Sequence, residues 1–172
     1  MPDVRNLTSL LQSSQKTLFI LCGLPYAGKS YVAEEVRKHA DVVFVSVDEL
    51  FHAKGFDWDA NKLPDADTWQ RIFAESYDVV RAALNEGKHV LYDSTNHTVV
   101  SRDALRDVAH TVGATARVVY VRTPVETVWA RWEENRQRPT RSVVSRELVE
   151  QTIETFETPT ADEQVITIDN LT

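Results

Sequence analysis

The stretch FILCGLPYAGKSYVAEEV, from Phe19 to Val36, contains a glycine-rich turn between a strand-like and a helix-like segment. An apolar run, Thr17 to Cys22, predicts a strand just before its glycines, and a helix-like segment follows them. Four of its positions fit the pattern G-x-x-x-x-G-K-[ST]: Gly23, Gly28, Lys29 and Ser30. Because this motif is meaningful only between a strand and a helix, the flanks strengthen the match. We predict a phosphate-binding loop after the first strand.

The chemistry of such a loop explains its residue types. Successive backbone N–H groups point inward to hold phosphate oxygens, and glycine permits the close approach. We expect Lys29 to reach the β- and γ-phosphates and Ser30 to offer its hydroxyl oxygen to Mg²⁺, while the positive end of the following helix attracts the anion. The structural alternative is a plain glycine turn. The predicted ligands are ATP and Mg²⁺, and the predicted ATP-binding residues of this region are Gly23, Leu24, Pro25, Tyr26, Ala27, Gly28, Lys29, Ser30 and Tyr31.

The length and composition of the chain suit a single domain spanning residues 1–172, in which residues 1–15 form an N-terminal extension. The net charge of −7 provides no global basic field, which argues against unspecific DNA or RNA binding. The chain has one cysteine, and we find neither a signal peptide nor an apolar membrane span. We therefore expect a cytoplasmic protein.

Strand-like and helix-like segments alternate along the chain. The apolar strand-like runs are Thr17–Gly23, Val42–Val47, His89–Tyr92, Ala116–Val121 and Val165–Ile168. The helix-like segments are Lys29–His39, Asp67–Asn85, Val99–Val112, Pro124–Asn135 and Ser145–Glu157, with Asp67 and Ser145 as start signals. This alternation predicts an α/β fold with a parallel sheet covered on both faces. Ligands of such sheets bind beyond the carboxyl ends of the strands.

Two carboxylates follow predicted strands. In VFVSVDEL, Asp48 would face the phosphate end of ATP and could accept the proton of an attacking hydroxyl. In HVLYDSTNHT, Asp93 could hold Mg²⁺, and Thr95 and Asn96 could bond phosphate or substrate. Helix capping is the structural alternative for both aspartates, because short polar residues often cap the helix after a strand.

Arginines are concentrated in the segment ARWEENRQRPTRSVVS, which we predict to be a lid over residues 131–146. An arginine that closes over the γ-phosphate offsets the charge that moves during transfer. The alternative is a solvated charged face, but Glu133 and Glu134 could pair with only part of the arginines, and Pro139 interrupts helical pairing. The other candidate substrate-facing segment is the long loop FHAKGFDWDANKLPDAD, where Trp58 could stack on a substrate ring.

The ordered motifs resemble the polynucleotide-kinase-like branch of P-loop kinases, which includes seryl-tRNA kinases. The resemblance runs from LFILCGLPYAGKS through VSVDEL and VLYDSTN to ENRQRPTRSVVSRELVEQTIETFETPTADE, nearly the whole chain. It implies a five-stranded parallel sheet in the order 2-3-1-4-5, ATP as donor and a hydroxyl as acceptor. It further implies Asp48 as general base, Asp93 near Mg²⁺, and Arg131, Arg136 and Arg141 as lid arginines that bind ATP, with Arg136 and Lys29 acting in catalysis.

One departure concerns the acceptor. Polynucleotide kinases of this branch place a phosphate-gripping arginine three residues after the base, where this chain has Phe51. The first hypothesis is therefore a kinase that phosphorylates a hydroxyl of a small molecule. A kinase for RNA 5′-hydroxyl ends and a nucleotide-dependent switch or adaptor that slowly hydrolyses ATP are the alternatives. Asp48 distinguishes a kinase from a switch, because a kinase needs a base for its substrate hydroxyl and a switch does not.

Overall fold

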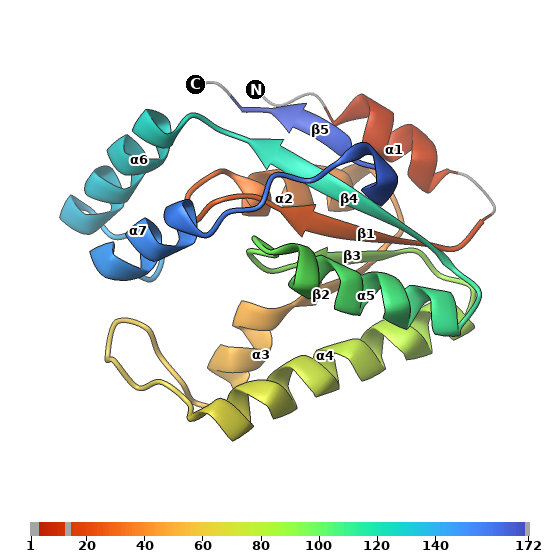
Figure 1. Ribbon diagram of the computed structural model, residues 1–172, viewed down its shortest axis with the longest axis horizontal. Helices are drawn as coiled ribbons and strands as arrows, with labels where there is room; N and C mark the ends of the chain where they lie inside the picture. Colours follow the sequence, from red (N-terminus) through yellow and green to blue (C-terminus); the bar gives the residue numbers. More distant parts are fainter. Residues whose placement is uncertain (1–3, 13–14, 171–172) are drawn as a thin grey trace.

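A five-stranded parallel sheet forms the centre of the computed structural model, which describes residues 4–12 and 15–170 (Figure 1). The strand order is β2-β3-β1-β4-β5, and every neighbouring pair is parallel. This confirms the fold class and the order 2-3-1-4-5. The strands are β1 (Thr17–Cys22), β2 (Val43–Ser46), β3 (Val90–Asp93), β4 (Thr115–Arg122) and β5 (Ile166–Asp169).

Helices cover both faces of this sheet. They are α1 (Arg5–Leu11), α2 (Lys29–His39), α3 (Val47–Ala53), α4 (Ala66–Asn85), α5 (Val99–Thr111), α6 (Val125–Gln137), α7 (Arg146–Glu154) and the short 3-10 helix η1 (Ala161–Glu163). In the described part of the chain, none of the helices combines the length and the apolarity needed to cross a membrane.

Strand β1 is buried along its whole length because both of its faces are covered. Phe19 and Leu21 pack with residues of α1, α2, α6 and α7. Leu18, Ile20 and Cys22 point to the other face and pack with α4 and α5. An unbroken apolar run is the pattern expected of a central parallel strand.

Three local features differ from the expectations. Helix α3 was not predicted and occupies the start of the long loop after β2. Helix α4 is capped by Asp65, whose carboxylate accepts a hydrogen bond from Thr68 N, so Asp67 is not its start signal. Within the predicted N-terminal extension, α1 buries Leu7 and Leu11 in the core.

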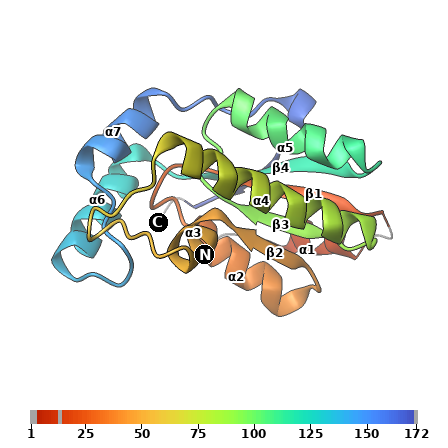
Figure 2. The ribbon, with the colours of Figure 1, turned by 90° about the horizontal axis from the view of Figure 1, so that it is seen from below.

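The carboxyl ends of β1, β2 and β3 meet at one edge of the sheet. Ser46, at the end of β2, is the register partner of Asp93, at the end of β3. Figure 2 shows the α3–α4 connection on the same side of the molecule as α6 and α7. A hydrogen bond of 2.7 Å from Val143 N to Asp59 Oδ1 joins these two regions. The edge is thus enclosed by segments distant in sequence.

Candidate phosphate-binding site

The loop between β1 and α2 is held at both ends. Gly23 N donates to Thr95 O at 3.3 Å, which joins the loop to the turn after β3. Gly28 caps α2 with a φ of 96°, and a Cβ there would lie 2.4 Å from Asn170 Nδ2. This second position requires glycine, both for its left-handed backbone and for the close approach of Asn170.

Lys29 lies over this loop. Its Nζ donates to Gly23 O at 2.9 Å and to Leu24 O at 3.0 Å. Burial lowers the pKa of Lys29, and the charge of Asp93 opposes that shift. Ser30 follows in the first turn of α2 and is exposed. The loop therefore presents a positive charge and a hydroxyl at the helix start, the position that favours an anion.

Asp93 ends β3 beside that lysine. Burial raises the pKa of Asp93 to about 6, and the Lys29 ammonium opposes the rise. Thr98 caps α5 instead, through a 3.2 Å hydrogen bond from Ser101 N to its Oγ1. Among the described residues, none donates a hydrogen bond to the Asp93 carboxylate. A carboxylate with open oxygen atoms fits Mg²⁺, which prefers oxygen ligands.

Asp48 lies in the first turn of α3 and is exposed. Ser46 is the cap of this helix, since its Oγ accepts from Glu49 N at 3.3 Å. The charge of Asp48 acts on both Lys29 and Asp93. The structure thus brings the second predicted carboxylate to the same edge of the sheet and, within its described part, leaves that carboxylate without a hydrogen-bond donor.

The two predicted substrate ligands after β3 differ in their surroundings. Asn96 is 5% exposed, has a φ of 48°, and donates from Nδ2 to Leu21 O at 2.7 Å. Its amide therefore braces strand β1, and this geometry opposes the predicted contact with substrate. Thr95 is half-buried, and its backbone supports Gly23. A substrate role for the Thr95 side chain stays a prediction.

Two of the predicted lid arginines contact the loop and one does not. Arg131 Nη1 donates to Tyr26 O at 3.0 Å, and the guanidinium of Arg141 lies 4.0 Å from the centre of the Tyr26 ring. Arg136 instead forms a bidentate pair with Glu133, at 3.0 and 2.6 Å, on an exposed face of α6. The charged-face alternative describes Arg136 in this structure, and its predicted catalytic role stays a prediction.

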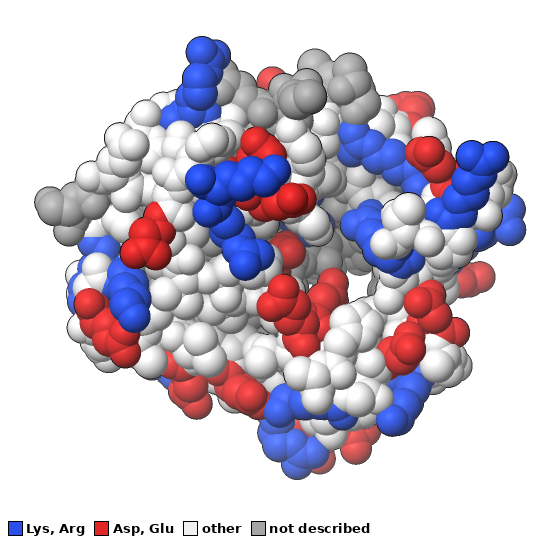
Figure 3. Space-filling model, turned by 180° about the vertical axis from the view of Figure 1, so that it is seen from behind, with Lys and Arg blue, Asp and Glu red and all other residues white. Residues whose placement is uncertain are grey.

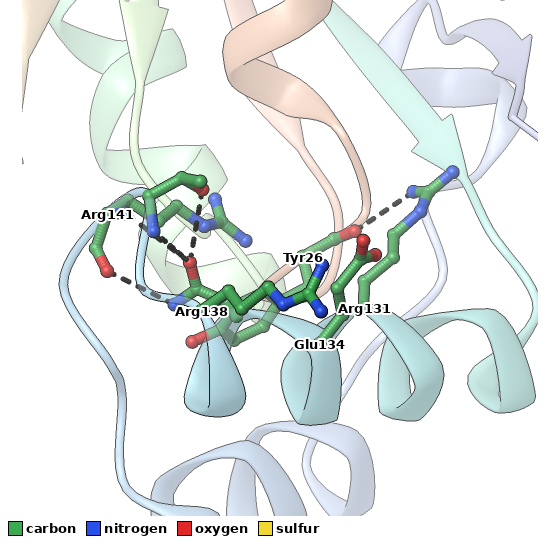
Figure 4. Close-up of a pocket in the computed structure, with 7 residues that line it drawn as sticks. Tyr26, Arg131, Glu134, Arg138 and Arg141 are labelled. Atoms are coloured by element: carbon green, nitrogen blue, oxygen red, sulfur yellow. Dashed lines mark hydrogen bonds between the residues drawn. The ribbon is translucent and has the colours of Figure 1, made fainter.

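A cavity of about 370 Å³ lies between the loop residue Tyr26 and the lid segment. Figure 4 shows Arg131 and Arg141 approaching Tyr26 from different directions at this cavity. It is lined by Tyr26, Arg131, Glu134, Asn135, Arg138, Thr140 and Arg141. From behind, the molecule is hollowed, and both acidic and basic side chains border the hollow (Figure 3). Three arginines line the cavity, which suits an anionic ligand, whereas Lys29, Ser30, Asp48 and Asp93 are not among its lining residues.

The buried support of the site was not predicted from the sequence. Arg102 is fully buried and binds Glu163 through two hydrogen bonds of 2.5 and 3.1 Å. Its Nη1 also donates to Asn96 O at 3.0 Å. The two partners lie 61 positions apart, so no local pattern pairs them. Trp58 stacks on the buried ring of Phe51 with a centroid distance of 4.8 Å, so one of its faces is occupied by the protein itself.

The comparisons with known proteins place this geometry in a family. Residues 18–159 match the model of a family described as an AAA domain. A protein in the structure of the Pnkp1/Rnl/Hen1 complex is 25% identical, with a TM-score of 0.62 over 70% of this chain and 40% of that chain. The present chain therefore spans less than half the length of that relative.

Two further structures share the fold over nearly the whole chain. A sugar kinase from Janibacter sp. HTCC2649 has a TM-score of 0.67, 14% identity and coverage of 90% of this chain and 85% of that chain. Kti12 of Chaetomium thermophilum, in complex with ADP-AlF3, has a TM-score of 0.63, 18% identity and coverage of 87% of both chains. The chain belongs to the AAA domain family and has the fold of a small P-loop kinase.

Proposed function

We propose that this protein is an ATP-dependent kinase that transfers the γ-phosphoryl group of MgATP to a hydroxyl of a small molecule. One observation carries the proposal. Asp48 follows β2 and Asp93 ends β3 at the edge of the sheet where the phosphate loop follows β1, while Ser46 and Thr98 perform the capping that could have occupied the two aspartates. A nucleotide-binding loop alone would not require Asp48 there.

The proposed reaction uses these residues in distinct roles. The acceptor oxygen forms a bond to the γ-phosphorus, the bond from that phosphorus to the bridging oxygen breaks, and ADP leaves. Asp48 takes the proton of the acceptor hydroxyl. Lys29 and Arg141 offset the charge on the phosphate oxygens. Ser30 and Asp93 would hold Mg²⁺, which supplies further neutralisation of the phosphates when bound.

Two features favour a small acceptor over an RNA end. Phe51 is fully buried in an aromatic stack, so it offers no substitute for the phosphate-gripping arginine of polynucleotide kinases. The net charge of −7 also opposes the approach of a polyanion. Sugars, nucleosides and antibiotics are all compatible with these features.

A transfer screen with γ-labelled ATP tests the proposal. The acceptors are nucleosides, sugars, antibiotics and RNA 5′-hydroxyl ends, each with wild type, Asp48→Asn and Glu49→Gln. We expect Asp48→Asn to lower transfer about 10²- to 10⁴-fold, the contribution typical of a general base, and to leave ATP affinity unchanged. Glu49→Gln is the matched control, because it removes a neighbouring exposed charge from the same turn.

The screen also distinguishes the alternatives. Transfer to RNA ends alone would replace the small-molecule acceptor with a polynucleotide. Slow ATP hydrolysis without transfer to any acceptor, unchanged in Asp48→Asn, would favour a nucleotide-dependent switch and contradict the proposed kinase.

A further inference from the structure

Tyr26 has a backbone conformation that is unusual for its residue type. Its φ is 63°, in the left-handed region that large side chains rarely adopt, and it is 4% exposed. Glycine would adopt this conformation without steric cost. Strain of this kind persists where the surrounding contacts hold the residue in place, and it often marks a functional position. The contacts of the tyrosine side chain are therefore of interest.

Three contacts connect Tyr26 to the lid side of the site. Its ring lies under the Arg141 guanidinium, 4.0 Å from the ring centre. Its hydroxyl accepts a hydrogen bond from Val144 N at 3.3 Å, and its backbone carbonyl accepts one from Arg131 at 3.0 Å. Figure 4 shows the two arginines near this one loop residue. Tyr26 thus joins the phosphate loop directly to α6 and to the segment after it.

Besides the hydrogen bond from Val144 N to the Tyr26 hydroxyl, further hydrogen bonds fix the backbone around Arg141. Asn135 Oδ1 accepts from Thr140 N at 3.0 Å and from Arg141 N at 3.3 Å, and its Nδ2 donates to Arg141 O at 3.1 Å. The Asp59 carboxylate accepts a hydrogen bond from Val143 N. These bonds set the path of the chain, whereas the contact with the Tyr26 ring sets the direction of the arginine side chain.

A guanidinium stacked on an aromatic ring keeps its N–H groups available in its own plane. Arg141 can therefore rest on Tyr26 and still donate hydrogen bonds to phosphate oxygens. Burial lowers the pKa of Arg141, and the negative charges of Asp48 and Asp93 oppose that shift.

We propose that Tyr26 is a positioning residue whose ring and hydroxyl hold Arg141 where it contacts the terminal phosphate of a bound nucleoside triphosphate. The inference rests on the proposed nucleotide site and deepens it by assigning recognition of the third phosphate to a tyrosine–arginine pair. Its consequence is specific: the pair strengthens binding of a triphosphate and leaves binding of a diphosphate nearly unchanged.

A double-mutant cycle in nucleotide binding tests this consequence. Calorimetry measures the affinities for the ATP analogue AMPPNP and for ADP, each with Mg²⁺, in wild type, Tyr26→Gly, Arg141→Gln and the double variant. We expect Tyr26→Gly and Arg141→Gln each to lower the preference for AMPPNP over ADP about tenfold, with no further loss in the double variant. Tyr26→Phe should give an intermediate loss, because it keeps the ring and removes the hydroxyl.

Tyr77→Phe on α4 is the control, since Tyr77 packs against Phe73 and Tyr92 outside the site. An unchanged preference in Tyr26→Gly, or independent losses that multiply in the double variant, would overturn the inference. If Tyr26→Gly does not fold, the same double-mutant cycle with Tyr26→Phe in its place tests the inference. A wild type that binds both nucleotides but phosphorylates no acceptor removes only the kinase proposal, and a wild type that binds neither removes both.

Discussion

Asp93 is held in surroundings that oppose its negative charge. Burial raises its pKa from 3.8 to about 6. The folded chain therefore binds this proton more tightly than the unfolded chain does, and the contribution of Asp93 to stability becomes less favourable as the pH rises from about 4 to about 6. At neutral pH the ionised side chain destabilises the fold by about 1–3 kcal/mol until a cation compensates it.

The substitution Asp93→Asn distinguishes the effect of the Asp93 charge on stability from its proposed role in binding Mg²⁺. Urea unfolding without Mg²⁺ should show the variant about 1–3 kcal/mol more stable than wild type at pH 7.5, with the difference vanishing near pH 4. The same variant should lose Mg²⁺-dependent nucleotide affinity, because a metal ligand is gone. Equal stability of both proteins at pH 7.5 would show that the carboxylate is not desolvated.

Gly28 illustrates a residue-scale constraint on the loop. A methyl group there would crowd Asn170 Nδ2 at 2.4 Å, in addition to the strain of a φ of 96°. Gly113 has a φ of 65° but nothing within 4 Å of the Cβ position, which makes it a matched control. We expect Gly113→Ala to cost about 1–2 kcal/mol and Gly28→Ala clearly more, measured by urea unfolding. Equal losses of stability in the two variants would mean that Asn170 moves away from the added methyl group without an energetic penalty.

At the scale of elements, the sequence predicted the strands well because apolar runs bounded by polar turns report burial directly. Strand β1 begins at the predicted Thr17 and ends at Cys22, one residue before the predicted Gly23. Helix α3 was missed because its seven residues bury only Val47 and Phe51, too few for a periodic signal. The caps Ser46 and Asp65 were also missed, since several short polar residues compete for each helix start and only backbone geometry selects one.

The brace between α5 and η1 has a stability consequence of its own. Replacing Arg102 by Met leaves the carboxylate of Glu163, 2% exposed, buried without its cation. We expect a loss of about 3–5 kcal/mol in urea unfolding, and recovery of much of it in Arg102→Met/Glu163→Gln, which removes both charges.

The exposed pair Arg122–Asp169 is the matched control for that experiment, because both side chains are about half accessible. Removing a surface ion pair costs under about 1 kcal/mol. If Arg102→Met were no more costly than Arg122→Met, the buried pair would not be the support that its geometry indicates.

At the scale of the whole molecule, the site is assembled at the carboxyl edge of the sheet. The parallel topology placed Asp48 and Asp93 beside the loop of Lys29, as strand alternation led us to expect. The arrangement of the lid could not be predicted from the sequence. Arg136 pairs with Glu133 three residues away, whereas Arg141 reaches Tyr26 across more than a hundred positions, and nothing local distinguishes the two arginines.

Titration calorimetry of MgATP with wild type and Lys29→Ala tests whether the loop after β1 binds a nucleotide. We expect saturable binding by the wild type, and binding that is lost or at least about tenfold weaker without the ammonium group that the loop presents. Lys38→Ala, in the exposed last turn of the same helix, is the control, because it removes a lysine charge far from the loop. Absence of binding heat in the wild type, supported by an unchanged melting temperature with MgATP, would contradict the account, as would equal affinity in Lys29→Ala.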